Sequence, residues 1–104
     1  MKGYQVQFFT KQDLFHDGKH LSDWLIDSTR SYGIRGATVF IGETGFGQDR
    51  NFHSAHMFDM VDHPVQITMV VNEDECDRLF ALLLKEKLHL FYVKLPVEFG
   101  KIGG

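Results

Sequence analysis

The chain has 104 residues and a formal net charge of −3, with 43% hydrophobic and 24% charged residues. This length and composition predict one globular domain over residues 1–104 and argue against a disordered chain. The charged residues are interspersed, which excludes the basic patch of a nucleic-acid-binding surface, so no nucleic acid is expected as a partner. The ten phenylalanines are many for so small a core, so we expect some of them at a subunit interface.

The single cysteine, Cys76, excludes a disulfide within the chain and is typical of a reducing compartment. The first residues contain no apolar segment of the kind that a signal peptide has. No apolar run approaches the ~18 residues of a membrane span. We therefore expect a cytoplasmic protein that does not insert into a membrane.

The first half of the chain predicts a strand, a loop, a helix and a second strand. Apolar and polar side chains alternate over residues 3–10 until Phe9 follows Phe8, which indicates a central strand packed on both faces. Residues 11–20 are polar and predict a loop. Apolar residues at helical spacing predict a helix over residues 21–32, ended by Gly33. β-branched residues predict the next strand over residues 37–41.

A glycine-rich polar segment follows this second strand and is the best place in the chain for a ligand or a partner. Gly42, Gly45 and Gly47 weaken regular strand pairing. Residues 53–61 can resume as a strand, and residues 62–64 predict a turn. Neither standard phosphate-binding glycine motif is present. Two interpretations stay open: the hinge of a mobile loop, which composition alone favours, or backbone contact with a ligand.

The second half predicts a strand, a helix and a last strand. Residues 65–71 alternate between apolar and polar, and a helix begins directly after them, with Asn72 as N-cap and Glu75 in the capping-box position. The apolar stripe from Cys76 to Leu83 predicts its buried face, which makes Cys76 a buried structural thiol. Residues 88–95 predict the last strand, limited by Pro96 and followed by a short tail.

This order of elements predicts an α+β fold, a ferredoxin-like two-layer sandwich in which an antiparallel sheet carries two helices on one face. The other face of the sheet stays open. Phe9, Phe40, Val70 and Phe91 are expected on that open face, where they need cover. We therefore expect sheets of neighbouring subunits to pack together.

Candidate catalytic and metal-binding residues are few. No arrangement of nucleophile, base and acid is legible, so we do not expect an enzyme. On a strand, His53 and His56 point to opposite faces, which argues against a shared ion within one chain. One alternative hypothesis is a metal-binding trimer that uses His53, His56 or His63 across subunits. Another is an interaction module without a ligand.

Two stretches of the chain resemble the PII-like signalling proteins. They are Gly33-Ile-Arg-Gly-Ala-Thr-Val39 with the later Gly45-Phe-Gly-Gln48, and residues 65–71 with the acidic helix after them. Nearly the whole chain is similar to a small, largely uncharacterised branch of that group. The resemblance implies a homotrimer with inward-facing sheets and an adenine nucleotide (ATP, ADP or AMP) bound in clefts between subunits. It also implies a loop, near residues 44–54, that docks on an unidentified protein partner, such as a membrane transporter or an enzyme.

The resemblance assigns candidate nucleotide-binding residues by position. Thr38 matches an adenine-contacting threonine, Val70 an apolar contact, and residues 45–48 the base of the partner-binding loop. The family's phosphate-binding Gly-Asp-Gly-Lys turn is replaced by Lys87-Leu-His-Leu90, which implies weaker affinity for a triphosphate. An anion site would then need other lysines, for which Lys94 and Lys101 are the candidates. The predicted set is Thr38, Gly45, Phe46, Gly47, Gln48, Val70, Lys94 and Lys101.

Overall fold

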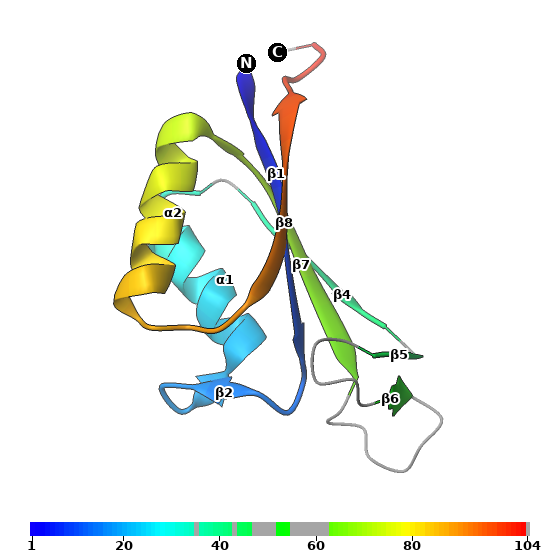
Figure 1. The fold of residues 1–104 in the computed structure, drawn as a ribbon. Coiled ribbons are helices and arrows are strands. Elements are labelled where there is room, and N and C mark those ends of the chain that lie inside the picture. Colours follow the sequence, from blue (N-terminus) through cyan, green and yellow to red (C-terminus); the bar gives the residue numbers. More distant parts are fainter. Residues whose placement is uncertain (35, 43, 47–51, 55–62, 104) are drawn as a thin grey trace.

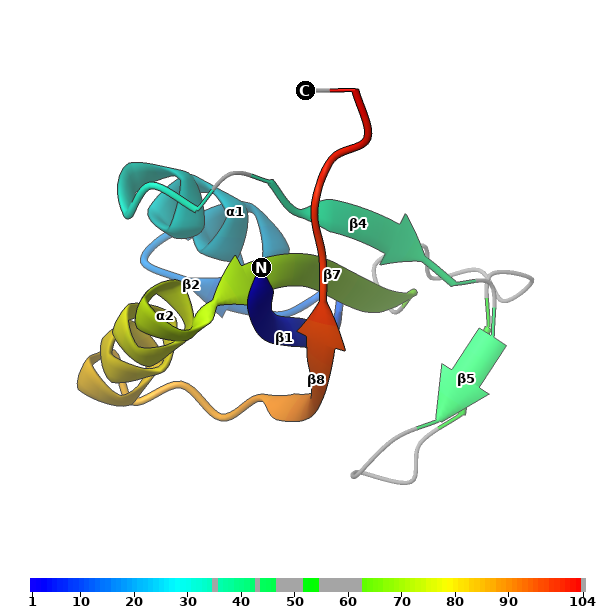
Figure 2. The same cartoon turned by 90° about the horizontal axis from the view of Figure 1, so that it is seen from above.

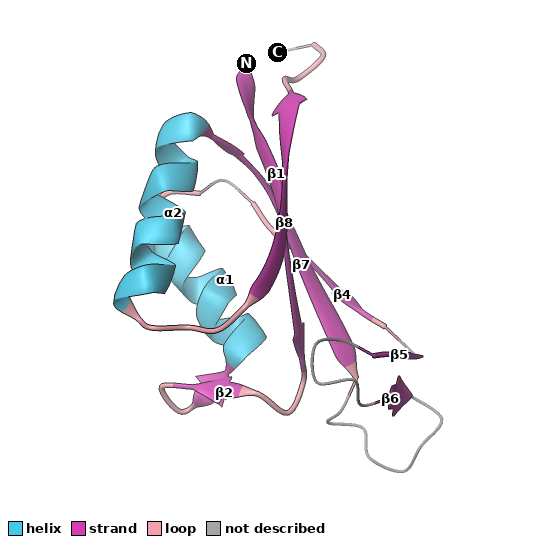
Figure 3. Cartoon of the chain, viewed as in Figure 1, coloured by secondary structure: helices cyan, strands magenta, loops and turns pink. Residues whose placement is uncertain are grey.

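The structure is a computed structural model that describes residues 1–34, 36–42, 44–46, 52–54 and 63–103 (Figure 1). Its elements in chain order are β1 (Lys2–Lys11), β2 (Phe15–His16), β3 (Lys19–His20), α1 (Leu21–Ser31), β4 (Thr38–Ile41), β5 (Thr44–Phe46), β6 (Phe52–Ser54), β7 (Pro64–Asn72), α2 (Glu73–Lys85) and β8 (Phe91–Glu98). Four strands form an antiparallel sheet in the order β4-β7-β1-β8. Both helices cover one face of this sheet, which confirms the predicted two-layer α+β fold (Figures 1 and 3).

The central strand β1 sets the register of the sheet. It pairs with β7 from Gly3 opposite Asn72 to Lys11 opposite Pro64, and with β8 from Lys2 opposite Glu98 to Phe9 opposite Phe91. Strands β4 and β8 are therefore the two outer strands of the sheet. Because residues paired directly opposite each other share a face, the register fixes which side chains meet the helices and which do not.

The hydrophobic core lies between the sheet and the two helices. The core residues of β1 and β7 stand at alternate positions that point into it, and each of them is at most 2% exposed. Together with Ile34, which follows α1, both helices supply the opposing layer. The core residues are Val6, Phe8, Leu21, Trp24, Leu25, Ile34, Val65, Ile67, Met69, Val71, Cys76, Leu79, Leu82 and Leu83.

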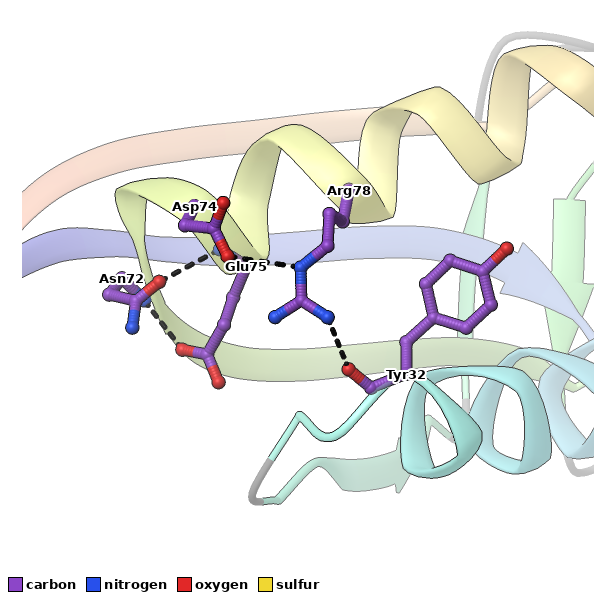
Figure 4. Close-up of polar contacts among 5 residues, drawn as sticks. All are labelled: Tyr32, Asn72, Asp74, Glu75 and Arg78. Atoms are coloured by element: carbon purple, nitrogen blue, oxygen red, sulfur yellow. Dashed lines mark hydrogen bonds and ion pairs between the residues drawn. The ribbon is translucent and has the colours of Figure 1, made fainter.

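The start of α2 carries the predicted capping box (Figure 4). The backbone N–H of Glu75 donates to Oδ1 of Asn72 at 2.8 Å, and the backbone N–H of Asn72 donates to Oε1 of Glu75 at 2.8 Å. One turn later, Arg78 donates from Nε to Asp74 at 3.1 Å and from Nη1 to the carbonyl oxygen of Tyr32 at 2.8 Å (Figure 4). This last bond ties α2 to the end of α1.

Both helices end in the same hydrogen-bonded motif. After α1, Gly33 (φ 81°) donates to the carbonyl of Arg30, and Ile34 donates to the carbonyl of Thr29. After α2, Lys87 (φ 57°) and Leu88 repeat the two bonds with Leu84 and Leu83. This is the Schellman motif, in which a left-handed residue lets the chain leave the helix. It confirms Gly33 as the residue that ends the first helix.

Residues 11–20 are not a plain loop. They contain the short hairpin of β2 and β3, which turns at Asp17 (φ 51°) and Gly18 (φ 77°). The sequence does not predict this hairpin, because strands of two residues are too short to show an alternation of apolar and polar side chains.

The last strand begins later and ends later than predicted. The motif that ends α2 occupies Leu88, so β8 starts at Phe91 and continues through Pro96 to Glu98. Proline is tolerated there because β8 is an outer strand, where a missing backbone donor costs no ladder hydrogen bond.

The glycine-rich segment is more regular than expected. Residues 44–46 form β5 and pair with β6, with Gly45 opposite His53. The expected strand over residues 53–61 overlaps β6 only at residues 53 and 54, and its remainder lies outside the described residues. No helix in the described part of the chain is long and apolar enough to span a bilayer.

Candidate functional site

The face of the sheet opposite the helices is the open face, and the register places three rows of side chains across it. The first row crosses Phe40, Gln66, Phe9 and Phe91, and the second crosses Thr38, Thr68, Gln7 and Val93. The third crosses Val70, Gln5 and Leu95. The four residues predicted for this face are therefore all on it.

The apolar side chains of the open face are exposed to solvent in the single chain. The exposed fraction is 36% for Phe9, 55% for Phe40, 40% for Val70 and 48% for Phe91. Phe9 and Phe91 pack against each other with ring centroids 5.7 Å apart. An apolar patch that spans four strands is typical of a surface that contacts another molecule.

Thr38 and Val70 lie close together near one edge of the open face. Thr38 is exposed on the outer strand β4 and stands opposite Thr68, and Val70 is the next residue of β7 on the same face. The Thr68 hydroxyl accepts a hydrogen bond from Nε2 of Gln66 at 3.1 Å. The structure thus brings the predicted threonine and the predicted apolar contact onto one surface, beside a short polar track.

The strand that carries Thr38 leads directly to the predicted loop base. Gly45 and Phe46 lie in β5, which forms a separate two-stranded sheet with β6 beyond the end of β4 (Figure 1). Figure 2 shows β5 beyond β4 from above. Gly47 and Gln48 lie outside the described residues.

The two candidate lysines lie away from Thr38. Lys94 is on β8, the opposite outer strand, and its register partner Val6 is a core residue. Its side chain therefore points to the helical side of the sheet, with Nζ 4.2 Å from the centroid of the Tyr4 ring. Lys101 is exposed in the tail that follows β8. Within one chain, neither lysine meets Thr38 or Val70.

Cys76 is the buried thiol that the helix pattern predicts, with 1% of its surface exposed. Burial raises the pKa of this thiol above its ordinary value of 9.0, and the Lys94 ammonium that is hydrogen-bonded to it offsets part of this rise in pKa. The thiol is therefore neutral at neutral pH and packs as a small apolar side chain.

Two grooves lie elsewhere on the described surface. One, of about 440 Å³, is lined by the ends of β1 and β8 and by Glu73. The other, of about 710 Å³, lies between the β2–β3 hairpin, α1 and Val39. Neither of these two grooves is lined by a predicted site residue.

The comparison with protein families assigns the chain to a family. The model of the DUF190 family, described as "Uncharacterized ACR, COG1993", matches residues 3–92. The chain belongs to the DUF190 family. A UPF0166 protein of Aquifex aeolicus (strain VF5) is similar to this DUF190 chain, with 24% identity over 82 residues that make up 79% of this chain and 78% of the relative.

Solved structures similar to this DUF190 chain include PII-like proteins. CPII from Thiomonas intermedia K12, described as a nitrogen regulatory PII-like protein bound to ADP, AMP and bicarbonate, has a TM-score of 0.68 at 16% identity, covering 97% of this chain and 91% of its own. A PII-like signaling protein from Thermus thermophilus has a TM-score of 0.64 at 14% identity, covering 92% of this chain and 89% of its own. The expected PII-like fold is confirmed.

The histidines of the metal hypothesis are not gathered into one site by the described residues of this DUF190 chain. His63 is 8% exposed, and its carbonyl accepts a hydrogen bond from the backbone of Gln12 at 3.0 Å. His53 lies in β6, and His56 lies outside the described residues. His63 does not belong to a group of three potential ligands among the residues that the structure describes.

The polar track beside Thr38 was not predicted from the sequence. The polar residues of this track alternate with core residues on β1 and β7, a pattern that indicates only a solvent-facing side of the sheet. These residues are Gln7, Gln66 and Thr68. Only the pairing of the strands brings these residues together, because it places Thr68 between Thr38 and Gln7. The sequence of a single strand does not reveal this pairing.

Proposed function

We propose that this DUF190 protein is a non-enzymatic, PII-like signalling protein of the cytoplasm. In this proposal it forms a homotrimer, binds an adenine nucleotide in clefts between subunits, and reports the nucleotide to a protein partner through the loop near residues 44–54. The observation that carries the proposal is the exposed apolar open face with Thr38 at its edge. The similarity in fold to CPII, which is described as bound to ADP and AMP, supports it.

The position of the candidate residues favours a site between subunits over a site within one chain. Thr38 and Val70 lie toward the β4 edge, whereas Lys94 and Lys101 belong to the β8 edge and the tail after it. In a cyclic assembly with head-to-tail contacts, unlike edges of neighbouring subunits meet. Each cleft then takes Thr38 and Val70 from one subunit and lysines from the next.

The number of lysines that can reach a phosphate favours an adenine nucleotide with few phosphate groups. Lys94 already lies over the Tyr4 ring and near Phe80 on the helical side, so a phosphate must draw it away from these contacts. Lys101 is exposed and can meet a phosphate without such a rearrangement. With so few cations, ADP or AMP is the expected ligand in preference to ATP.

Isothermal titration with ATP, ADP, AMP and cyclic AMP tests the proposal. We expect saturable binding of at least one of them, with one molecule per protomer, and weaker binding to Thr38→Val, which keeps the shape of the side chain and loses its hydroxyl. Thr68→Val, directly opposite Thr38 on β7, tests in parallel whether the polar track beside Thr38 also contacts the nucleotide. The absence of binding by all four nucleotides at millimolar concentration would overturn the nucleotide part of the proposal.

Sedimentation velocity tests the assembly separately. The exposed open face predicts a stable trimer at micromolar concentrations, because apolar side chains exposed on all four strands favour contact with another subunit. A stable monomer would contradict both the assembly and the location of the nucleotide between subunits.

A further inference from the structure

Three potential metal ligands meet on the helical side of the molecule, away from the open face. His16 belongs to β2, Asp17 to the turn of the β2–β3 hairpin, and Glu86 is the C-cap residue of α2. Nε2 of His16 lies 2.9 Å from Oε1 of Glu86 and 3.9 Å from Oδ2 of Asp17. The three ligand atoms all lie within 4.8 Å of one another, although 70 residues separate His16 from Glu86.

The imidazole of this group is held in place by packing. Its ring contacts Trp24 of α1 edge-on, with centroids 4.6 Å apart and planes at 79°. The side chain of His16 is 20% exposed and that of Glu86 is 27% exposed, while Asp17 is 67% exposed. The tertiary structure therefore orients the nitrogen and one carboxylate, and the exposed Asp17 can adjust to a third position.

The spacing suits a transition-metal ion. Two ligand atoms that each bind a tetrahedral ion at about 2.1 Å are about 3.4 Å apart. The distances from Nε2 of His16 to Glu86 (2.9 Å) and to Asp17 (3.9 Å) lie on either side of this value. One imidazole with carboxylates is a donor set for Zn²⁺ and its neighbours, whereas Mg²⁺ and Ca²⁺ prefer oxygen alone.

The local charge also favours a cation. Asp17 and Glu86 bring two carboxylates to one imidazole within 4.8 Å, and like charges at this distance repel each other. The nearby Lys19 is engaged elsewhere, with Nζ 3.0 Å from Asp27. A simple hydrogen bond between His16 and Glu86 would account for their distance and would leave Asp17 without a role in the cluster.

We propose that His16, Asp17 and Glu86 form a binding site for a divalent transition-metal ion of the Zn²⁺ class, with water in the remaining coordination positions. The ion joins the β2–β3 hairpin to the C-terminal end of α2, two segments that Figure 1 shows on the same side of the sheet. This site is separate from the proposed nucleotide cleft, so either can exist without the other.

Trp24 is the only tryptophan of the chain, and its contact with His16 makes it a local reporter. Co²⁺, a paramagnetic substitute for Zn²⁺, is titrated into the wild-type protein while Trp24 fluorescence is recorded. We expect saturable quenching that excess Zn²⁺ reverses and excess Mg²⁺ does not. Quenching that does not saturate, or that Mg²⁺ reverses equally well, would overturn the proposal.

Asp17→Asn is the decisive variant. Asp17 does not make the His16–Glu86 hydrogen bond, and asparagine accepts the left-handed conformation of this turn, so the fold and the pair are preserved. Since even a partner outside the coordination sphere contributes about 10- to 100-fold to metal affinity, loss of a ligand is expected to weaken Co²⁺ binding at least about tenfold.

His16→Gln and His89→Gln complete the test. We expect His16→Gln to abolish the quenching of Trp24, and His89→Gln, at an exposed histidine after α2, to leave it unchanged. Wild-type quenching in Asp17→Asn and His16→Gln, or an equal loss in His89→Gln, would show that Co²⁺ binds elsewhere and would overturn the proposal.

Discussion

Lys87 occupies a backbone conformation that few side chains adopt. Its φ of 57° places it in the left-handed region directly after the C-cap of α2, where glycine is the usual residue. A left-handed conformation costs a non-glycine residue about 1 to 2 kcal/mol. The chain keeps a lysine there because the two hydrogen bonds of the motif and the half-buried Leu88 hold the turn.

Lys87→Gly is therefore expected to stabilise the protein. The relief of strain exceeds the added entropy of the unfolded chain, so the free energy of unfolding should rise by about 0.5 to 1 kcal/mol. Urea denaturation measures it. Lys85→Gly, two residues earlier in the last turn of α2, is the matched control and should lower the free energy of unfolding by about 1 kcal/mol. A loss of stability in both variants would contradict the claim that Lys87 is strained by its left-handed conformation.

Cys76 gives a pH dependence whose sign follows from its burial. Its pKa is raised in the folded chain, chiefly by burial, from an ordinary value of 9.0. The folded state thus holds the proton more tightly than the unfolded state. The stability that this proton contributes is complete below pH 9.0 and is lost as pH rises toward the folded-state pKa.

The measurement is the free energy of unfolding between about pH 8 and 10, a window that spans the ordinary thiol pKa. The wild type should lose stability more steeply than Cys76→Ala, in which no thiol titrates. Parallel slopes for the two proteins would show that burial does not raise the thiol pKa.

Residues whose environment is set by near neighbours were predictable. Asn72 and Glu75 are three positions apart, and Cys76 lies on a stripe that one helix defines, so their roles could be read from spacing. The partnership of His16 with Glu86 could not, because it joins positions 70 residues apart. Lys94 is a candidate site residue only because of its position in the family resemblance. Its packing on Tyr4 was not predictable, because it depends on the pairing of two strands.

The helix α2 depends on its capping box at the element scale. Asn72→Ala removes the side-chain acceptor of the Glu75 N–H and is expected to lower the free energy of unfolding by about 1 kcal/mol. Asn72→Ser retains an acceptor and should restore most of the loss. Thermal and urea denaturation of the two variants check this. Equal stability of alanine and serine variants would mean that the cap contributes little.

Long elements with a clear period were predicted well, and short or outer ones were not. α1, α2, β1 and β7 bury one face each, so their apolar spacing carries the signal. β8 is an outer strand with mostly exposed residues, so its sequence pattern predicts neither its start at Phe91 nor its continuation through Pro96. The β2–β3 hairpin depends on the left-handed turn at Asp17 and Gly18, which composition alone presents as a loop.

The open face governs behaviour at the scale of the whole molecule. Phe40 and Ile41 are adjacent on β4 and almost equally exposed, at 55% and 56%, but they point to opposite faces of the sheet. Phe40→Asp places a charge in the proposed subunit interface and should yield a folded monomer. Ile41→Asp places it on the helical side and should leave the trimer intact. Sedimentation velocity and circular dichroism distinguish these outcomes, and identical behaviour of the two variants would contradict an interface on the open face.

The two-layer architecture followed from the order of elements, because two strand–helix–strand units with right-handed crossovers put both helices on one face. The open face followed from the second set of apolar residues on the strands. The complete nucleotide site did not follow from one chain. In the proposed site, Thr38 and the two lysines come from opposite edges of the sheet, and one chain does not bring them together.

The central claim is that an adenine nucleotide binds between subunits, and titration of ADP into matched trimeric and monomeric proteins tests it most directly. We expect Phe91→Asp, which charges the open face on β8 away from the Thr38 of its own chain, to be monomeric, and Ile41→Asp to remain trimeric as the control. Calorimetry should show saturable binding of ADP to the wild type and to Ile41→Asp, and none to Phe91→Asp. Binding of equal affinity to the monomer, or no binding to the wild type at millimolar ADP, would contradict the account.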